Sequence, residues 1–245
     1  MTAKQTLPLT CVAHRGGRKL GTENTLATIE KALQLGVDAI EIDVWRVGSQ
    51  LIVTHDREFG RVITGNGRVV DLRPTEIRTL RHYDGSTVAT LDTVMNLVGN
   101  KARLNIELKG PDCAEAVAAM INGFCRDHGT AIDQFIVSSF DHQQLYWLQQ
   151  HAAKIPRGVL IYGHLHDGIA CCQALQAYSY HPSIDFIDPQ SITQARQLGM
   201  EVWVFTVNRT DDFEELQSLG VTGVFTDDPE LLLAFNTRGQ SSQQN

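Results

Sequence analysis

The segment 39–44, Ala-Ile-Glu-Ile-Asp-Val, places a carboxylate at every second position of an otherwise apolar run. In a β-strand, successive side chains point to opposite faces, so the three aliphatic side chains share one face, and Glu41 and Asp43 share the other. The aliphatic face is expected to contact covering helices, which leaves both carboxylates on the inner face. Two like charges in a low-dielectric interior are costly without a counter-ion. The segment therefore predicts a strand that carries a charged interior site.

A second segment, 103–109 or Arg-Leu-Asn-Ile-Glu-Leu-Lys, repeats this alternation. Its aliphatic residues share one face, and Asn105, Glu107 and Lys109 share the other. Together with the two carboxylates of the first segment, Glu107 would complete an oxygen cage suited to one divalent cation, Mg²⁺ or Ca²⁺. The alternative is that these carboxylates only form salt bridges with Arg15 and Lys109.

Short β-rich runs alternate with longer segments of helical spacing along most of the chain. A parallel connection between strands needs a crossover, usually a helix, so the alternation predicts a parallel sheet. The predicted strands are 10–15, 39–46, 51–55, 103–109, 135–140, 158–162, 184–187, 201–207 and 223–226. The predicted helices are 25–35, 114–125, 142–151, 168–178, 192–198, 211–219 and 229–235. Eight main strands and one extra hairpin strand, 51–55, favour an α/β fold of the TIM (β/α)8 barrel type over an open sheet.

The ends of several predicted helices follow from local residue types. Gly36, Gly199 and Gly220 each follow the last apolar position of a helix, where a left-handed residue closes it. The segment 22–25, Thr-Glu-Asn-Thr, is interpreted as a helix start in which the asparagine or the second threonine is the N-cap.

The whole chain, 1–245, is expected to form a single domain. The stretch 57–90 is rich in glycine, and within it only 75–80 has helical character. We interpret this stretch as a small insertion after the second strand, at the mouth of the barrel. The last eight residues, 238–245, are polar and are expected to be frayed.

The composition excludes several classes of protein. The 245 residues include 21 Lys+Arg and 28 Asp+Glu, which gives a formal net charge of −7, and 42% are apolar. An apolar fraction of this size offsets the entropy of ordering the chain, so disorder is not expected. An acidic chain without a Lys/Arg run lacks the basic surface that nucleic acid or anionic lipid requires, so neither is an expected partner.

The cysteines and the N-terminal segment bear on the compartment. The five cysteines include one adjacent pair, and their odd number argues against a disulfide framework. The apolar stretch 7–13 is too short and too interrupted for a secretory signal, and no run of about 18 apolar residues predicts a membrane span. We therefore expect a cytoplasmic protein, and the oligomeric state is left open.

Two histidines stand at the ends of predicted strands. His14 lies at the end of 10–15, and His55 ends 51–55 and precedes Asp56. In a barrel, the C-terminal ends of the strands face the active site. Imidazole can act as a general acid or base near neutral pH, so two of them beside a carboxylate cage predict a catalytic pair. A single histidine at a strand end is more often structural.

A second histidine pair, His164 and His166, has the alternate spacing of metal ligands. It falls in a predicted loop without an obvious third ligand, so it is the weaker candidate for a metal site.

Four further side chains complete the candidate site. Arg15 and Lys109 add positive charge beside the cage. A metal ion, an arginine and a lysine together suit a phosphoryl group, whose transfer depends on charge neutralisation and positioning. Phe140 and Phe205, at two later strand ends, could line a cleft for the carbon skeleton of a substrate or belong to the barrel core.

The ordered set of these motifs resembles the glycerophosphodiester phosphodiesterase family. The resemblance runs from about residue 10 to residue 228 and departs from the family pattern at Thr22, where proline is usual, and at Phe205, where tryptophan is common. The motifs that carry it are His14-Arg15-Gly16, Glu23-Asn24-Thr25, Glu41-Ile42-Asp43, His55-Asp56, Ile106-Glu107-Leu108-Lys109, Ser138-Ser139-Phe140 and Phe205-Thr206-Val207-Asn208.

The resemblance implies a compact bacterial hydrolase with a role in glycerol and lipid metabolism. This enzyme would use a divalent cation to hydrolyse glycerophosphodiesters to an alcohol and sn-glycerol 3-phosphate. By position, the implied metal ligands are Glu41, Asp43 and Glu107, the implied catalytic pair is His14 and His55, and the implied phosphate contacts are Arg15 and Lys109.

Two other functions compete with this one. A metal-dependent barrel phosphodiesterase or lyase, of the phospholipase C-like or sphingomyelinase D-like type, would release a cyclic phosphate. A catalytically inactive barrel used for binding would have lost at least one key residue, and here all are present. We expect small soluble diesters as substrates, and the head group and the metal are left open.

Overall fold

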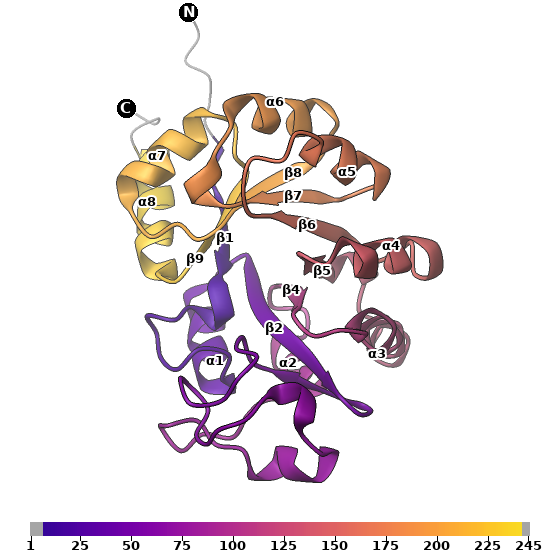
Figure 1. The fold of residues 1–245 in the computed structure, drawn as a ribbon. Coiled ribbons are helices and arrows are strands. Elements are labelled where there is room, and N and C mark those ends of the chain that lie inside the picture. The colour runs from indigo at the N-terminus through magenta and orange to yellow at the C-terminus, as the bar shows by residue number, and fades with distance from the viewer. Residues whose placement is uncertain (1–6, 242–245) are drawn as a thin grey trace, which may run out of the picture.

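The strands close into a barrel with helices on its outside (Figure 1). The computed structural model describes residues 7–241 of the chain. Eight parallel strands follow one another in the order β1, β2, β4, β5, β6, β7, β8 and β9, and β9 pairs with β1 to close the ring. The ninth strand, β3, pairs with β2 in the antiparallel direction. The predicted TIM (β/α)8 barrel with one extra hairpin strand is confirmed.

The strand and helix boundaries agree with most of the predicted segments. The strands are β1 (Thr10–Ala13), β2 (Ala39–Val47), β3 (Gln50–Val53), β4 (Arg103–Leu108), β5 (Phe135–Ser139), β6 (Arg157–Ile161), β7 (Ser179–Pro182), β8 (Glu201–Val204) and β9 (Gly223–Thr226). The α-helices are α1 (Leu26–Leu35), α2 (Leu91–Val98), α3 (Cys113–His128), α4 (His142–His151), α5 (Gly168–Ala174), α6 (Pro189–Gln197), α7 (Thr210–Ser218) and α8 (Pro229–Ser241).

The strand predicted at 184–187 is wrong. The sixth barrel strand is β7, which precedes that segment, and Ile184–Phe186 form the short 3-10 helix η5. The hydroxyl of Ser183 accepts a hydrogen bond from the backbone N–H of Asp185, at 3.2 Å, and so caps this turn. The chain therefore leaves the sheet after Ser183, which still bridges to Phe205, although the apolar pattern of 184–187 resembles that of a strand.

Two further predictions need correction. Helix α2 lies between the insertion and β4, where no helix was predicted, and it buries Leu91, Val94, Met95 and Val98 on one face. The tail was expected to be frayed from residue 238, but α8 continues to Ser241, and 242–245 lie outside the described residues.

Two local predictions are confirmed: the glycines that end helices, and the alternation of aliphatic and polar side chains in the strands. Gly36, Gly199 and Gly220 have φ angles of 77°, 79° and 91°, the left-handed conformation that ends a helix. The main hydrophobic core between the barrel and its helices includes the alternate aliphatic side chains of the two carboxylate-bearing segments, Ile40, Ile42 and Val44 of β2 and Leu104, Ile106 and Leu108 of β4. Their polar neighbours in sequence therefore point into the barrel.

Packed rings fill part of the barrel interior. The His181 ring stacks on that of Trp203 with centroids 5.5 Å apart and planes 5° apart, and the Phe225 ring lies against both. Gly158 and Gly223 leave the necessary room, because a Cβ atom on Gly158 would collide with the His181 ring, and one on Gly223 would lie 2.8 Å from Trp203 Cδ1. The barrel is thus a packed core and not a pore.

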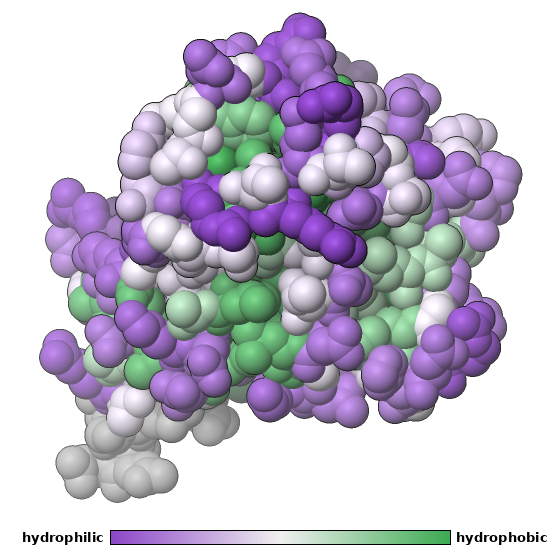
Figure 2. Space-filling model, turned by 90° about the horizontal axis from the view of Figure 1, so that it is seen from below, coloured by the Kyte–Doolittle hydropathy of each residue, from purple (hydrophilic) through white to green (hydrophobic). Residues whose placement is uncertain are grey.

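The insertion between β3 and α2 packs against the β2–β3 hairpin in a second, smaller hydrophobic cluster. The insertion contains the 3-10 helices η2 (Val69–Asp71) and η3 (Pro74–Thr79), the second of which overlaps the predicted helical segment 75–80. The buried members of this cluster share no residue with the main core, and they are Trp45, Val47, Ile52, Ile63, Val69, Ile77 and Val88. The insertion lies at the bottom of Figure 1, and seen from below that end is largely hydrophilic with hydrophobic patches between (Figure 2).

No helix within residues 7–241 combines the length and the apolar character needed to cross a membrane.

Candidate active site

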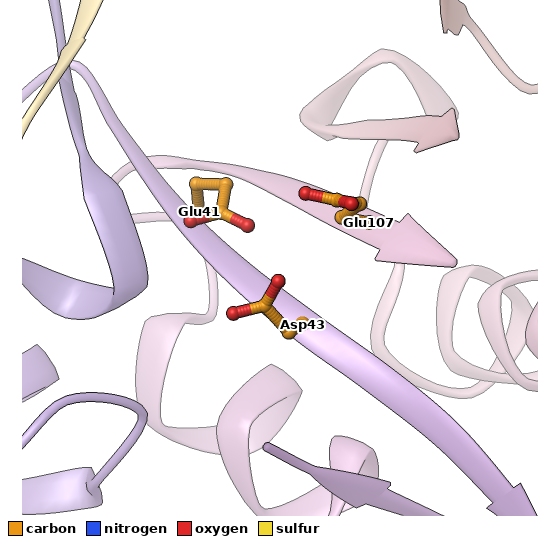
Figure 3. Close-up of side chains that lie close together, drawn as sticks. All are labelled: Glu41, Asp43 and Glu107. Carbon is orange, nitrogen blue, oxygen red and sulfur yellow. The ribbon is translucent and has the colours of Figure 1, made fainter. Parts of the chain in front are cut away.

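Three carboxylates face one another inside the barrel (Figure 3). Glu41 and Asp43 project from β2 and Glu107 projects from β4, where Asp43 and Glu107 stand at the same level of the sheet. Each offers a carboxylate oxygen within 4.8 Å of the others, and all three side chains are buried. Within the described part of the chain, this is the one group of His, Cys, Asp and Glu side chains with the geometry to hold a metal ion.

Some oxygens of the carboxylate cluster accept a hydrogen bond, and others have no hydrogen-bond partner. Glu41 Oε2 accepts a hydrogen bond from the backbone N–H of Arg15 at 2.7 Å, and Asp43 Oδ2 accepts one from Asn24 Nδ2 at 2.9 Å. The other oxygens, Glu41 Oε1 and Asp43 Oδ1, are buried without a hydrogen-bond partner, as is Asn105 Oδ1. Buried polar atoms are rarely left unpaired, and oxygen is the ligand that Mg²⁺ and Ca²⁺ prefer. These residues fit a divalent cation.

The electrostatics of the cluster also favour a cation. Burial raises the pKa of Glu41 well above its ordinary value, and the charges of Asp43 and Glu107 raise it further. Burial and the Asp43 charge likewise raise the pKa of Glu107, to about 7. A bound cation would compensate these charges and favour the ionised carboxylates.

The two positively charged side chains predicted for the site, Lys109 and Arg15, lie beside the carboxylate cluster. Lys109 Nζ is 2.8 Å from Glu107 Oε1 and 3.9 Å from Asp43 Oδ1. Arg15 lies in the short 3-10 helix η1 (His14–Gly16), with its Nε 3.5 Å from Asp43 Oδ2. The salt bridges weighed in the sequence are therefore present, but Glu41 Oε1 and Asp43 Oδ1 still lack a hydrogen-bond partner.

His14 follows β1 directly and is oriented by a carboxylate. Its Nδ1 lies 2.7 Å from Asp227 Oδ1, and its Nε2 accepts a hydrogen bond from Arg15 Nε at 3.3 Å. This places the ring proton on Nδ1 and leaves Nε2 as the basic nitrogen. Asn208 Nδ2 donates to the second oxygen of Asp227 at 3.0 Å and holds that carboxylate in place.

His55 follows β3 and has a similar partner. Its Nδ1 lies 2.8 Å from Oδ1 of the adjacent Asp56, and its side chain is 30% exposed. Burial lowers the pKa of His55, and the charges of Arg15 and Lys109 lower it further, against the opposing effect of Asp43 and Asp56. The site thus contains two imidazoles, each paired with one carboxylate.

The predicted aromatic residues lie together at the mouth. The Phe140 and Phe205 rings contact edge to face with centroids 5.6 Å apart, and Lys109 Nζ lies 5.8 Å from the Phe140 ring centroid. Both rings line a small cavity of about 30 Å³ that also borders His14 and Glu107. All nine predicted site residues therefore lie around one mouth of the barrel.

A family comparison identifies the group to which this arrangement belongs. The model of the "Glycerophosphoryl diester phosphodiesterase family" matches residues 14–231. The chain belongs to this family. It is accordingly a phosphodiesterase, as predicted.

Individual members of the family resemble this phosphodiesterase along most of their length. A glycerophosphodiester phosphodiesterase of Caldanaerobacter subterraneus subsp. tengcongensis is 32% identical over 242 residues, which cover 93% of this chain and 98% of the relative. A glycerophosphodiester phosphodiesterase of Bacillus altitudinis is 29% identical over 235 residues, which cover 89% of this chain and 94% of the relative. An Oleispira antarctica phosphodiesterase, solved with the product sn-glycerol-3-phosphate, has a TM-score of 0.84 at 26% identity and covers 94% of this chain and 96% of its own.

Several residues around the site of this phosphodiesterase were missed in the sequence. Segment 22–25 was interpreted as a helix start and as part of the family resemblance, without a role in the site, and Thr25 does accept a capping hydrogen bond from Thr28 N. Its neighbours nevertheless point into the site: Asn24, at a φ of 60°, bonds Asp43, and Glu23 contacts Arg15. The signal available in the sequence was the family resemblance of Glu23-Asn24-Thr25, and their burial is seen only in the structure.

The weaker histidine pair does not form a metal site. The His166 side chain is fully exposed, and its nearest ion-pair partner is the neighbouring Asp167 at 3.9 Å. His164 lies edge to face against the Phe186 ring, with centroids 5.5 Å apart. Both line a cavity of about 510 Å³ beside α6, which is larger than the cavity at the mouth but contains none of the predicted site residues.

Proposed function

We propose that this phosphodiesterase hydrolyses glycerophosphodiesters to an alcohol and sn-glycerol 3-phosphate. The observation that carries the proposal is the presence of three buried carboxylates beside Arg15 and Lys109, with two carboxylate-paired imidazoles at the same mouth. The names of the relatives, and the product held by the Oleispira antarctica enzyme, support this substrate class.

Glu41, Asp43 and Glu107 would hold one divalent cation, Mg²⁺ or Ca²⁺. When bound, such a cation supplies positive charge that stabilises the developing charge on phosphate oxygens. Arg15 and Asn24 contribute by fixing one oxygen each of Glu41 and Asp43, so that the remaining oxygens converge. These hydrogen bonds set the geometry of the cluster before any substrate enters.

The remaining side chains bind and orient the diester. The guanidinium of Arg15 and the ammonium of Lys109 would bind non-bridging phosphate oxygens, because both are part-buried cations at the edge of the cluster. Phe140 and Phe205 would contact the carbon skeleton of the glycerol group and exclude water from it.

His14 and His55 would transfer the two protons of the reaction. His14 Nε2 is the basic nitrogen of an imidazole fixed by Asp227, so we assign it as the general base that activates water or the glycerol 2-hydroxyl. His55 would then protonate the leaving alkoxide, and Asp56 would stabilise its protonated form. The lowered pKa of His55 favours its neutral form and opposes this order, so the order needs its own test.

The decisive experiment measures release of glycerol 3-phosphate from a panel of glycerophosphodiesters. The assay is run with EDTA and with Mg²⁺, Ca²⁺ or Mn²⁺ added back. Phosphorus NMR of the products separates hydrolysis from the competing lyase reaction, because a lyase would accumulate a cyclic phosphate. Absence of glycerol 3-phosphate under every condition would contradict the proposal, and absence of the cyclic phosphate as well would favour a binding role.

Cytoplasmic location and soluble substrates stay predictions from the sequence. Cell fractionation tests the first, and sedimentation with phospholipid vesicles at physiological salt tests the second. Strong vesicle binding would contradict the expectation of small soluble diesters.

A further inference from the structure

One arginine of the insertion joins the two sides of the site. Arg61 Nε donates to Asp56 Oδ2 at 2.6 Å, and the other oxygen of Asp56 contacts His55 Nδ1. The terminal nitrogens of Arg61 donate to both oxygens of Glu23, one of them at 3.1 Å. Glu23 Oε1 in turn accepts from Arg15 Nη1 at 3.0 Å. A continuous chain of contacts thus runs from His55 to Arg15.

Among the described residues, Arg61 is the only one that forms hydrogen bonds to both Asp56 and Glu23. Its Nε and terminal nitrogens point in fixed directions within one plane, so one guanidinium can serve two carboxylates at once. Glu23 belongs to the loop before α1, and Asp56 belongs to the loop after β3. The insertion therefore supplies the link between two separate walls of the mouth.

The charges of Glu23 and Asp56 favour their bridging by the Arg61 guanidinium. Burial alone would raise the pKa of Glu23, but hydrogen bonds from Arg61 and Arg15 and the charges of both lower it below its ordinary value. The pKa of Asp56 is lowered in the same way, because Arg61 and His55 outweigh the effect of burial. Both carboxylates are therefore anions that the Arg61 guanidinium stabilises.

We propose that Arg61 is a positioning residue of this phosphodiesterase, which holds Asp56 against His55 and Glu23 against Arg15. Through the first contact the insertion orients an imidazole, and through the second it orients a guanidinium at the carboxylate cluster. The effect on catalysis rests on the proposed function, whereas the effect on His55 itself does not.

The Arg61→Met variant is expected to fold. Glu23 keeps two other arginines, Arg15 and Arg18, with Arg18 Nε 3.1 Å from Glu23 Oε2. Asp56 is 25% exposed and can be solvated. Arg73→Met is the matched control, because Arg73 lies next to η3 of the same insertion and, within residues 7–241, its side chain pairs with Glu76 alone, far from the carboxylate cluster's partners.

The first measurement is steady-state kinetics on a glycerophosphodiester. Arg61→Met should lower kcat about 10- to 100-fold, the range found when partners that orient active groups are removed. Arg61→Lys should recover only part of the loss, because one ammonium cannot reach both carboxylates in the same geometry. Arg73→Met should match the wild type. Equal kcat for Arg61→Met and the wild type would overturn the proposal.

A double-mutant cycle tests whether Arg61 acts through Asp56. If it does, Arg61→Met combined with Asp56→Asn should lose much less than the product of the two single losses. A merely structural role of Arg61 predicts multiplied losses, and that result would contradict positioning through Asp56.

A measurement independent of turnover separates this proposal from the proposed function. In protein labelled with ¹⁵N-histidine, the imidazole signals of His55 should shift in Arg61→Met and stay unchanged in Arg73→Met. Unchanged His55 signals in Arg61→Met would overturn the positioning role. Shifted signals in a protein that hydrolyses no glycerophosphodiester would uphold the positioning and overturn only the proposed function.

Discussion

His14 and Asp227 are 213 positions apart in the chain, yet His14 Nδ1 lies 2.7 Å from Asp227 Oδ1. The pairing of β1 with β9, in which Ala13 stands beside Thr226, brings the two residues together at the mouth. Closure of the barrel therefore orients this imidazole. His55, by contrast, takes its carboxylate from the next residue in the chain.

We expect Asp227→Asn to lower kcat by about 10²- to 10⁴-fold, because the amide no longer enforces the tautomer in which His14 Nε2 is basic. The exposed Asp211, whose nearest ion-pair partner is Arg209 at 3.5 Å, provides the control variant Asp211→Asn. Steady-state kinetics on the same diester compare the two. Equal rates for both variants would mean that Asp227 does not orient His14 during the reaction.

The roles of the two histidines can be separated with a substrate whose leaving group is p-nitrophenolate. Loss of a general acid or base typically costs about 10²- to 10⁴-fold, so His14→Ala and His55→Ala should both fall in this range on an alkyl diester. The p-nitrophenyl diester needs little protonation, so the acid variant, assigned as His55→Ala, should recover much of its rate. Selective recovery of His14→Ala would reverse the assignment.

Removal of a carboxylate from the cluster should abolish activity without loss of stability. Glu41→Gln replaces a buried group that repels Asp43 and Glu107, so its melting temperature in EDTA should equal or exceed that of the wild type. Added Mg²⁺ or Ca²⁺ should stabilise the wild type and not the variant. Because the pKa of Glu107 is raised to about 7, the metal affinity of the wild type should increase as the pH rises through 7. Full activity in chelator would contradict the metal proposal.

Gly158→Ala should destabilise the protein by about 1–3 kcal/mol, since the new methyl group meets the His181 ring, which is stacked on Trp203 and cannot retreat. Gly123→Ala, inside α3, meets no atom closer than 3.7 Å and should stabilise by about 0.5–1 kcal/mol. Urea denaturation measures both. A neutral Gly158→Ala would show that the ring packing inside the barrel is loose.

The buried His181 should make stability depend on pH. Burial lowers the pKa of His181 to about 3, whereas the unfolded chain has a value of about 6.5. Between these values the unfolded state binds a proton that the folded state does not, so stability decreases as the pH falls through this window, by up to about 1.4 kcal/mol per unit. His181→Phe should flatten the pH dependence of the melting temperature between pH 4 and 6.5. Parallel curves for variant and wild type would contradict a neutral buried imidazole.

The carboxylate cluster could be predicted from sequence because the alternation of β2 and β4 is purely local. Glu41, Asp43 and Glu107 each lie between aliphatic neighbours, and the side-chain period of a strand decides which way they point. The partners of the histidines differ in this respect. Asp227 and Arg61 reach His14 and Asp56 only through barrel closure and through the fold of the insertion, which no local pattern contains.

The errors in secondary structure have local causes. Strand β7, Ser-Tyr-His-Pro, contains a buried histidine and ends in proline, both unusual in a strand, so the more apolar 184–187 was preferred. Helix α2 has only eight residues, and its apolar spacing at Leu91, Val94, Met95 and Val98 follows a glycine-rich stretch that suggested continued irregular structure.

The smaller hydrophobic cluster beneath the insertion has a consequence for the local stability of the site. Four of the seven buried residues, Ile63, Val69, Ile77 and Val88, belong to the insertion and pack on the β2–β3 hairpin without joining the main core, so they can separate from the hairpin while the barrel stays folded. Such a subglobal opening would carry Arg61 away from Asp56 and Glu23 and leave the carboxylates of β2 and β4 in place. The fraction of molecules ready to react would then depend on the free energy of opening the insertion, which is smaller than the free energy of unfolding the whole protein.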